Sequence, residues 1–215
     1  MLPGRVFDDV TRKMLPSARV AVVHLFRHGE VQTGSARVCR GVSDVPLSAR
    51  GTTQSSAVAA RFLREHGAPD RVLSSDLSRC RAMAEAFGAP VELLPGLREQ
   101  DMGAWEGRTW ESLSIDDPDA VHAYWNDYAR ARPTGGESWE EAAARVGAAW
   151  AALGPLEGRI VVCTHVGPVR ALLCAWLGLE FDQALRFAPA YASEARVLLA
   201  EAGAVVEQFG RPPDP

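Results

Sequence analysis

The run Val20-Ala21-Val22-Val23-His24-Leu25-Phe26 is followed at once by Arg27-His28-Gly29-Glu30. A short apolar run rich in β-branched residues is typical of a buried strand. The strand therefore ends by presenting a guanidinium and an imidazole. Ligands of open α/β sheets bind in the crevice outside the carboxyl ends of the strands. We expect these two side chains to lie in a binding site.

A later stretch repeats this arrangement. Residues 159–164 (Arg-Ile-Val-Val-Cys-Thr) form a second strand-like run, which leads directly into His165 and then into Val166-Gly167-Pro168 and a helical pattern. Two histidines at strand ends suggest one site that is assembled from two distant parts of the chain.

Helices and strands alternate along the rest of the chain. The periodicity predicts helices over 48–66, from a cap at Ser75 or Asp76 to about 87, from Ser138 (with Glu141 in a capping box) to 153, and over 168–177. Further strands are expected over 71–74 and 90–94, and a hairpin over 195–200 and 204–209. This order predicts an α/β fold, a three-layer α/β/α sandwich with a mainly parallel sheet and an antiparallel edge.

The predicted domain organisation is simple. Residues 19–210 are expected to form a single domain, preceded by an N-terminal extension over 1–18 whose order is left open. Met14 is an alternative first residue. The helical pattern of 109–133 is broken at 116–118, and we expect residues 103–137 to form a helical insertion over one end of the sheet.

Composition excludes several function classes. The 215 residues carry 23 Lys and Arg against 27 Asp and Glu, a net charge of −4, which argues against nucleic acid or a membrane as partner. The longest apolar run, 171–179, is too short to span a bilayer. The first nineteen residues lack the apolar core of a signal peptide, so we expect a cytoplasmic protein. The four cysteines show neither disulfide nor zinc spacing, and no metal site is expected.

The chemistry-bearing residues at the strand ends suit a phosphoryl group. Arg27, His28 and His165 follow strands, and Arg79 falls in the first turn of the helix after the second strand. Guanidiniums bind tetrahedral oxyanions bidentately and keep their charge. An imidazole is a competent nucleophile at neutral pH. We therefore expect these four side chains to converge on a phosphoryl group.

Hydrolysis of a phosphate ester also needs an acid to protonate the leaving oxygen. Glu99 is the candidate, because it follows the third strand at the same edge of the sheet. Asp101 and Glu106 are rivals that spacing alone does not exclude.

Four motifs occur in an order that resembles a known family. They are Arg27–Glu30, Ser74–Arg79, Leu97–Gly107 and Thr164–Gly167. Over about residues 20–210 the chain resembles the histidine phosphatase superfamily, which has the phosphoglycerate-mutase-like fold. The resemblance implies metal-free and cofactor-free phosphotransfer through a phosphohistidine on His28, with Glu99 as the acid and then the base. It implies that the phosphoryl oxygens are held by Arg27, Arg79 and His165.

The pattern favours a phosphatase over a mutase. Mutases of this superfamily typically continue Arg-His-Gly-Glu with Trp-Asn, where this chain has Val31-Gln32-Thr33-Gly34. They carry a Tyr three residues after the catalytic Glu, where this chain has Met102. An adjacent arginine pair in the insertion is replaced by Arg130 and Arg132, which Ala131 separates.

Among phosphatases, the chain is most similar to the α-ribazole phosphatase subgroup. The shared stretches are Gly41–Leu47, Tyr124–Asp127, Pro133–Ser138 and Arg145-Val146. We expect a phosphomonoesterase that acts on a small phosphorylated metabolite, with α-ribazole 5′-phosphate as the leading substrate. A mutase-type phosphotransferase and a non-catalytic phospholigand-binding module are the alternatives. The sequence does not fix the oligomeric state, and a homodimer stays open.

Some residues allow two interpretations. Gly167 and Arg40 are candidates for substrate binding, although a loop arginine is as often simply solvated. Glu30 is expected to brace the first loop, while His24, His66, His122, Arg81 and Arg98 are assigned no role. Five aromatic residues of the predicted insertion could stack on a heteroaromatic base or pack in a helical core. They are Trp105, Trp110, Tyr124, Trp125 and Tyr128.

Overall fold

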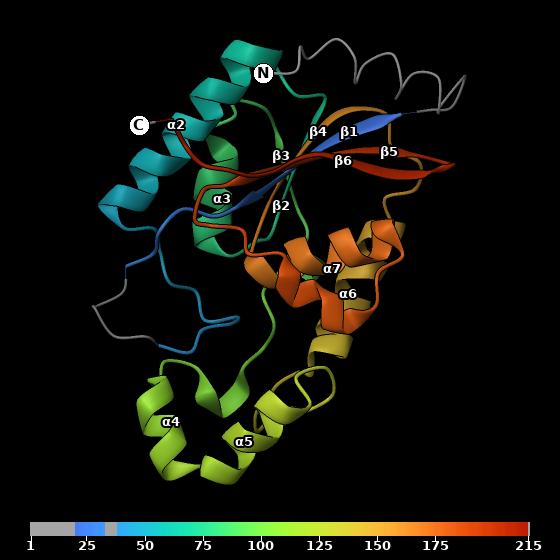
Figure 1. Ribbon diagram of the computed structural model, residues 1–215. Helices are drawn as coiled ribbons and strands as arrows, with labels where there is room; N and C mark the ends of the chain where they lie inside the picture. The colour runs from blue at the N-terminus through green and yellow to red at the C-terminus, as the bar shows by residue number, and fades with distance from the viewer. Residues whose placement is uncertain (1–19, 33–37, 215) are drawn as a thin grey trace, which may run out of the picture.

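A mixed sheet of six strands organises the part of the chain that the computed structural model describes, residues 20–32 and 38–214 (Figure 1). The order in the sheet is β3-β2-β4-β1-β5-β6, in which neighbouring strands among β1 to β4 are parallel and β5 and β6 form an antiparallel edge. This confirms the predicted sheet. The strands are β1 Ala21–Arg27, β2 Arg71–Ser74, β3 Val91–Leu93, β4 Gly158–Thr164, β5 Glu194–Ala200 and β6 Gly203–Arg211. The expected N-terminal extension, 1–18, lies outside the described residues.

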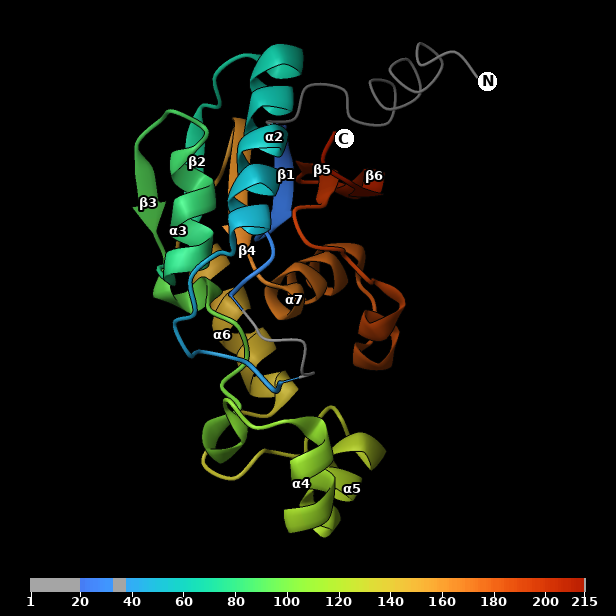
Figure 2. The ribbon, with the colours of Figure 1, turned by 90° about the vertical axis from the view of Figure 1, so that its left-hand side faces the viewer.

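Helices cover both faces of the sheet, as Figure 2 shows. On one face lie α2 (Ala49–His66) and α3 (Ser78–Glu85), and on the other lie α6 (Trp139–Ala151) and α7 (Val166–Leu177). Successive side chains of a strand point to opposite faces. In β4, Ile160 and Val162 therefore pack in the α6 and α7 core, while Val161 and Cys163 pack in the α2 and α3 core. Burial on both sides explains why the strand sequences are apolar without alternation.

Most predicted helix ends are confirmed. The Ser48 hydroxyl accepts the Gly51 N–H at 3.0 Å, and Ser138 and Glu141 form the expected capping box. The predicted cap of α3 at Ser75 or Asp76 is wrong, because the N-cap residue is Leu77, which makes no side-chain capping bond. Instead, the Ser75 hydroxyl and the Asp76 carboxylate are engaged by side chains from other elements.

The boundary of α7 also differs from the prediction. It begins at Val166, directly after His165, and not at Pro168. Pro168 occupies the first turn, where its missing N–H costs nothing. The N-terminal end of α7 consequently lies at the tip of β4.

The stretch between β3 and α6 holds two short helices that lie away from the sheet (Figures 1 and 2). These are α4 (Trp110–Asp116) and α5 (Pro118–Asn126), which meet at the predicted break. Three 3₁₀ turns complete the described elements: η1 (Pro95–Leu97), η2 (Gly103–Trp105) and η3 (Phe181–Arg186). A separate cluster of buried side chains joins α4 and α5 to η2, and its members are Cys39, Met102, Trp105, Leu113, Val121 and Tyr124.

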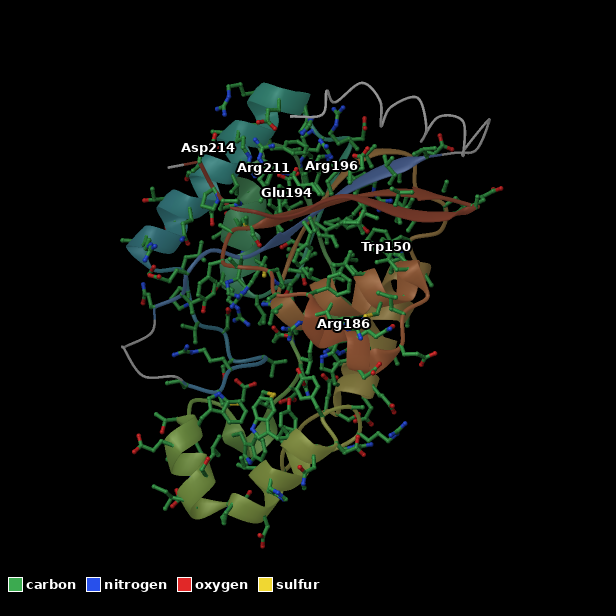
Figure 3. All side chains as sticks on the ribbon, viewed as in Figure 1. Trp150, Arg186, Glu194, Arg196, Arg211 and Asp214 are labelled. Carbon is green, nitrogen blue, oxygen red and sulfur yellow. The ribbon has the colours of Figure 1, made fainter. Side chains whose placement is uncertain are left out.

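A buried ion pair ties the C-terminal end to the sheet. Arg61 of α2 donates to the Glu194 carboxylate at 2.8 Å, and Glu194 also bonds Nδ1 of His24 at 2.7 Å. Arg61 further reaches the Pro212 carbonyl, and Figure 3 shows Glu194, Arg211 and Asp214 on this side of the sheet. His24, His66 and Glu194 offer ligand atoms within 4.8 Å of one another, but the two Glu194 oxygens are already bonded by His24 and Arg61. His24, to which the sequence assigned no role, is thus buried and bonded to Glu194.

Within the described residues, no helix has both the length and the apolar character needed to cross a membrane.

Candidate active site

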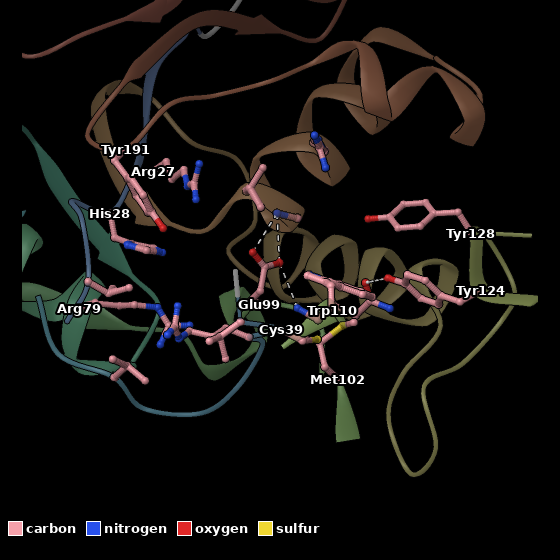
Figure 4. A pocket seen from close by; sticks show the side chains of 18 of the residues that line it. Arg27, His28, Cys39, Arg79, Glu99, Met102, Trp110, Tyr124, Tyr128 and Tyr191 are labelled. Carbon is pink, nitrogen blue, oxygen red and sulfur yellow. Dashed lines mark hydrogen bonds between the residues drawn. The ribbon is translucent and has the colours of Figure 1, made fainter. Parts of the chain in front are cut away.

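A cavity of about 280 Å³ opens at the C-terminal end of β1, between the sheet and the α4–α5 region (Figure 4). Six of the seven residues singled out from the sequence line it; the seventh, His165, lies behind it. The six are Arg27, His28, Arg40, Arg79, Glu99 and Gly167. Residues that the sequence predicted to share one site, up to 140 positions apart from Arg27 to Gly167, therefore line the same cavity.

His28 is the first residue after β1, and its ring is held in one orientation. Nδ1 lies 2.7 Å from the Gly29 carbonyl oxygen. A carbonyl only accepts, so Nδ1 carries the proton and the Nε2 lone pair is left free. Burial, and then the positive charges of Arg79 and Arg27, hold the pKa of His28 well below its usual 6.5. His28 is consequently a neutral imidazole with an unprotonated Nε2.

Arg27 ends β1, and its guanidinium is fixed from two sides. Nη1 donates to the Pro189 carbonyl at 2.9 Å, and the guanidinium carbon lies 4.0 Å from the centre of the Tyr191 ring. Burial lowers the pKa of Arg27, an effect that Tyr191 and Glu99 oppose. Its Nε is buried without a hydrogen-bond partner. The site thus holds a desolvated cation with unused donor capacity.

Arg79 lies in the first turn of α3 and joins three parts of the chain. Nη1 donates to the Ser43 carbonyl at 2.8 Å and Nη2 to the Gly41 carbonyl at 2.7 Å. Nε donates to Nδ1 of His165 at 3.2 Å. Each terminal nitrogen carries a second hydrogen, so Arg79 can bind an anion while it anchors the 41–43 loop.

His165 is completely buried, and both of its ring nitrogens have protein partners. Nδ1 accepts from Arg79, so Nε2 carries the proton and faces the Ser75 hydroxyl at 2.9 Å. Its ring centre lies 5.1 Å from that of His28. Burial is the largest cause of its lowered pKa, followed by the electrostatic effects of His28, Arg79 and Arg27. His165 thus bonds Arg79 and Ser75 and is not among the residues that line the cavity.

Glu99 faces the cavity, and its carboxylate is positioned by backbone amides. The Gly167 N–H lies 3.1 Å from Oε1 and 3.3 Å from Oε2, and the Gln100 N–H lies 3.1 Å from Oε1. A Cβ on Gly167 would lie 2.1 Å from Oε1. Position 167 therefore requires glycine in order to admit this carboxylate.

The two rival carboxylates are used elsewhere. Glu106 accepts the N–H groups of Val42 and Ser43 at 2.7 and 3.1 Å. Burial alone would raise the pKa of Glu106, but hydrogen bonds from the Ser43 side chain and from the backbone of Gly41, Ser43 and Met102 together outweigh burial and lower the pKa. Asp101 accepts the Gly103 N–H at 2.8 Å. Of the three candidates, Glu99 alone lines the cavity.

Sequence reasoning missed the residue that holds the Glu99 segment. Arg145 of α6 donates to the carbonyls of Gly96, Arg98 and Glu99 at 2.9, 3.1 and 3.2 Å. Its guanidinium also pairs with Glu137 at 2.7 and 2.9 Å. From the sequence, Arg145 was noted only in a stretch shared with a phosphatase subgroup. No local sequence pattern marks an arginine that binds the carbonyls of a distant loop.

Arg170 and Tyr191 also line the cavity and were not anticipated. Arg170 follows Val166 by four residues on α7, and this helical spacing could have placed it on the same face as Val166. Tyr191 precedes β5 in an irregular turn, so no periodicity indicated its position. Glu30, in contrast, braces the first loop as expected, because it accepts the Ser48 hydroxyl at 3.0 Å.

Sequence and structure comparisons place these observations among known proteins. The sequence model of the histidine phosphatase superfamily (branch 1) matches residues 23–211. The adenosylcobalamin/alpha-ribazole phosphatase of Escherichia coli K12 is 31% identical over 170 residues, which cover 76% of this chain and 82% of that protein. The "Probable phosphoglycerate mutase GpmB" of Enterobacter sp. 638 is 39% identical over 133 residues, 60% of this chain and 61% of that protein.

Solved structures share the whole fold. The alpha-ribazole phosphatase of Shigella flexneri superposes with a TM-score of 0.80 at 26% identity, over 88% of this chain and 96% of that one. The mycobacterial glucosyl-3-phosphoglycerate phosphatase superposes with a TM-score of 0.76 at 28% identity, over 90% of this chain and 100% of that one.

Proposed function

The chain is an enzyme of the histidine phosphatase superfamily (branch 1), and on that premise we propose that it hydrolyses a small phosphorylated metabolite through a phosphohistidine on His28. The observation that carries this proposal is the free Nε2 of a neutral His28 in the same cavity as Arg27, Arg79 and Glu99. A nucleophile, oxyanion donors and an acid are the three parts that the reaction requires.

The first step transfers the phosphoryl group to the protein. The Nε2 lone pair forms a bond to phosphorus, and the bond from phosphorus to the leaving oxygen breaks with its electrons on that oxygen. Glu99 acts as the general acid and gives a proton to the leaving oxygen, which departs as an alcohol. Glu99 is left as a carboxylate.

The second step regenerates the enzyme. The Glu99 carboxylate takes a proton from water while the water oxygen bonds to phosphorus. The phosphorus–nitrogen bond breaks and its electrons return to Nε2 of His28, which releases inorganic phosphate. Glu99 then holds the proton that the next cycle needs, so atoms and charge balance over the two steps.

Charge on the phosphoryl oxygens is neutralised by Arg27 and Arg79. A preorganised donor of this kind is worth about 3 kcal/mol in the transition state. His165 contributes by fixing Arg79 through its Nδ1. A direct bond from His165 to a phosphoryl oxygen requires the ring to give up either Arg79 or Ser75.

The donor set suits an anion rather than a divalent cation. Among the described residues, four guanidiniums line the cavity beside one carboxylate, Glu99. Divalent cations prefer several oxygen ligands, whereas guanidiniums pair with phosphoryl oxygens. This composition supports a reaction that does not depend on a metal.

The substrate we propose first is α-ribazole 5′-phosphate. The similarity to proteins named for that substrate supports it, as does the aromatic wall of the cavity. The similarity to a protein named as a phosphoglycerate mutase keeps a mutase-type transfer as the second candidate. The two differ in product, because only a phosphatase releases one phosphate for each ester consumed.

The test is phosphate release from p-nitrophenyl phosphate with EDTA present, for the unaltered protein and for His28→Ala. We expect turnover that resists EDTA and is abolished by His28→Ala. Turnover that survives His28→Ala would contradict the mechanism. Exposed His122, at which no role is expected, provides the matched control as His122→Ala.

A further inference from the structure

The cavity has two unlike walls. Figure 4 shows Arg27, His28, Arg79 and Tyr191 on one side, with Glu99 between them and Trp110, Tyr124 and Tyr128 on the other. The first wall consists of the groups that the proposed reaction uses. The second consists of aromatic side chains from α4, α5 and the turn after α5. A phosphoryl group can occupy only the first wall, so the second wall faces the leaving group.

The structure separates the aromatic residues of this region by burial. Trp105 and Tyr124 are 1% and 2% exposed, and they belong to the buried cluster that joins α4 and α5. Trp125, which follows Tyr124 on α5, is 56% exposed and yet lines the cavity. The two interpretations left open by the sequence therefore apply to different residues. Trp105 and Tyr124 pack in the buried cluster, whereas Trp125 exposes part of its ring at the cavity.

Neighbouring rings hold Trp125 in place. It stacks with Tyr128 at an interplanar angle of 10° and a centroid distance of 5.9 Å, and it meets Trp110 at 5.4 Å. Tyr124 contacts it edge-on at 5.4 Å. A large ring that is fixed by its neighbours and still half open loses little conformational entropy when a ligand stacks on it. Such an arrangement is suited to binding a flat group.

We propose that Trp125 is a specificity-determining residue that stacks on a planar aromatic ring in the leaving group of the substrate. This inference rests on the proposed function. It defines the substrate class as phosphomonoesters with the phosphoryl group at one end and a flat aromatic ring at the other. An aliphatic leaving group of the same size lacks the π-face that makes stacking favourable.

The test compares two non-hydrolysable ligands that differ only in the ring. Benzylphosphonate and cyclohexylmethylphosphonate have similar size and the same anionic group, but only the first is flat and aromatic. Their dissociation constants are measured by calorimetry for the unaltered protein and for Trp125→Leu and Trp125→Phe. We expect Trp125→Leu to weaken benzylphosphonate about tenfold, as loss of one stacking contact implies, and cyclohexylmethylphosphonate by less than threefold. Trp125→Phe should restore most of the difference.

A control variant and a second readout make the outcome decisive. Ile115→Ala removes a 72% exposed side chain of α4 that does not line the cavity, and it should change neither constant. Equal weakening of both ligands by Trp125→Leu, no weakening, or no binding of either ligand overturns the inference. Binding does not require turnover. The proposed function is judged separately, by loss of p-nitrophenyl phosphate hydrolysis in His28→Ala.

Discussion

The Arg27 guanidinium lies against the face of Tyr191, 4.0 Å from the ring centre, at the point where β1 ends. The turn that carries Tyr191 also holds the backbone of the site. The Ala192 N–H donates to the His28 carbonyl at 3.1 Å, and the Arg27 N–H donates to the Ser193 carbonyl at 3.2 Å. Ala192 has a φ of 52°, the left-handed region that few residues other than glycine adopt. This turn is strained locally while it fixes the Arg27–His28 pair.

Tyr191 is therefore predicted to position Arg27. Tyr191→Leu removes the aromatic face, and we expect kcat/KM for p-nitrophenyl phosphate to fall about tenfold, in line with a desolvated cation–π contact. Tyr191→Phe keeps the face and should retain most of the activity. Inhibition by inorganic phosphate separates positioning from a general structural effect. The inhibition constant should rise in Tyr191→Leu and stay unchanged in Tyr191→Phe, and an equal rise in both variants contradicts the prediction.

Gly167 is predicted to set the position of the Glu99 carboxylate. A Cβ at 167 would lie 2.1 Å from Oε1 of Glu99, so Gly167→Ala must displace the carboxylate. We expect kcat to fall at least tenfold, because a misplaced acid transfers its proton poorly. A crystal structure of the variant should show Glu99 turned away from residue 167.

Gly147 of α6 gives the matched control. A Cβ there meets no atom within 4 Å. Gly147→Ala should leave kcat unchanged and raise the free energy of unfolding by about 0.5–1 kcal/mol, as expected for alanine in a helix interior. Wild-type kcat in Gly167→Ala would refute the proposed contact.

The sequence predicted the parts of this site that depend on regular structure. The apolar runs of β1 and β4 show where each strand ends. In a parallel sheet the carboxyl ends of the strands lie at the same edge. His28 and His165 could therefore be placed together without coordinates. The Glu99 candidate followed from the same rule, although the choice over Asp101 and Glu106 needed the hydrogen bonds that occupy those two residues.

The site residues that the sequence did not predict depend on contacts with irregular segments. Arg145 donates to three carbonyls of a loop that is nearly fifty residues away in the sequence. Contacts of this kind leave no periodic pattern, so a single sequence does not predict them. Tyr191 lies in a turn whose shape depends on the left-handed Ala192. His165 was expected to touch the phosphoryl group. That expectation stays a prediction, and the hydrogen bonds of its ring could not be read from the sequence: Nδ1 accepts from Arg79 and Nε2 faces the Ser75 hydroxyl.

Protonation of His28 is predicted to limit both activity and stability at low pH. Its pKa in the folded protein lies well below 6.5 because it is buried beside two arginines. As pH falls below about 6.5, the unfolded chain takes up a proton that the folded protein does not, so the free energy of unfolding decreases. The loss should continue until the folded-state pKa is reached.

Chemical unfolding between pH 7.5 and 5 measures this effect. His28→Asn should flatten the decrease relative to the unaltered protein, whereas His122→Asn, at an exposed position, should not. The acidic limb of kcat/KM should likewise lie below pH 6.5. An acidic limb at or above 6.5 contradicts a neutral, desolvated His28.

Arg145 is predicted to stabilise the segment that carries Glu99. Arg145→Met keeps the aliphatic stem but removes the donor of three carbonyls and the ion-pair partner of Glu137, which retains the Asp101 N–H on its carboxylate. We expect a loss of about 2–3 kcal/mol of stability, typical for hydrogen bonds to a charged group, and a lower kcat. Arg145→Lys should not restore either, since one ammonium cannot reach all of these acceptors. Urea unfolding and steady-state kinetics on the two variants provide the check.

The activity of the enzyme is predicted to depend on the planar guanidinium of Arg79 and not only on its charge. Its three nitrogens bond the Ser43 carbonyl, the Gly41 carbonyl and His165 in three different directions. A lysine in its place supplies one charge but only one of these directions. Arg79→Lys should therefore lower kcat/KM about a hundredfold, the usual cost of losing a preorganised oxyanion donor, although the charge of the site is unchanged.

Arg81 lies two residues further along α3 and serves as the control. It is exposed and pairs with Glu85 at 3.8 Å. Arg81→Lys should leave kcat/KM within twofold of the unaltered protein, because a surface pair contributes little. If Arg79→Lys is as active as Arg81→Lys, then charge alone suffices at position 79. The guanidinium geometry would then have no part in binding the phosphoryl group.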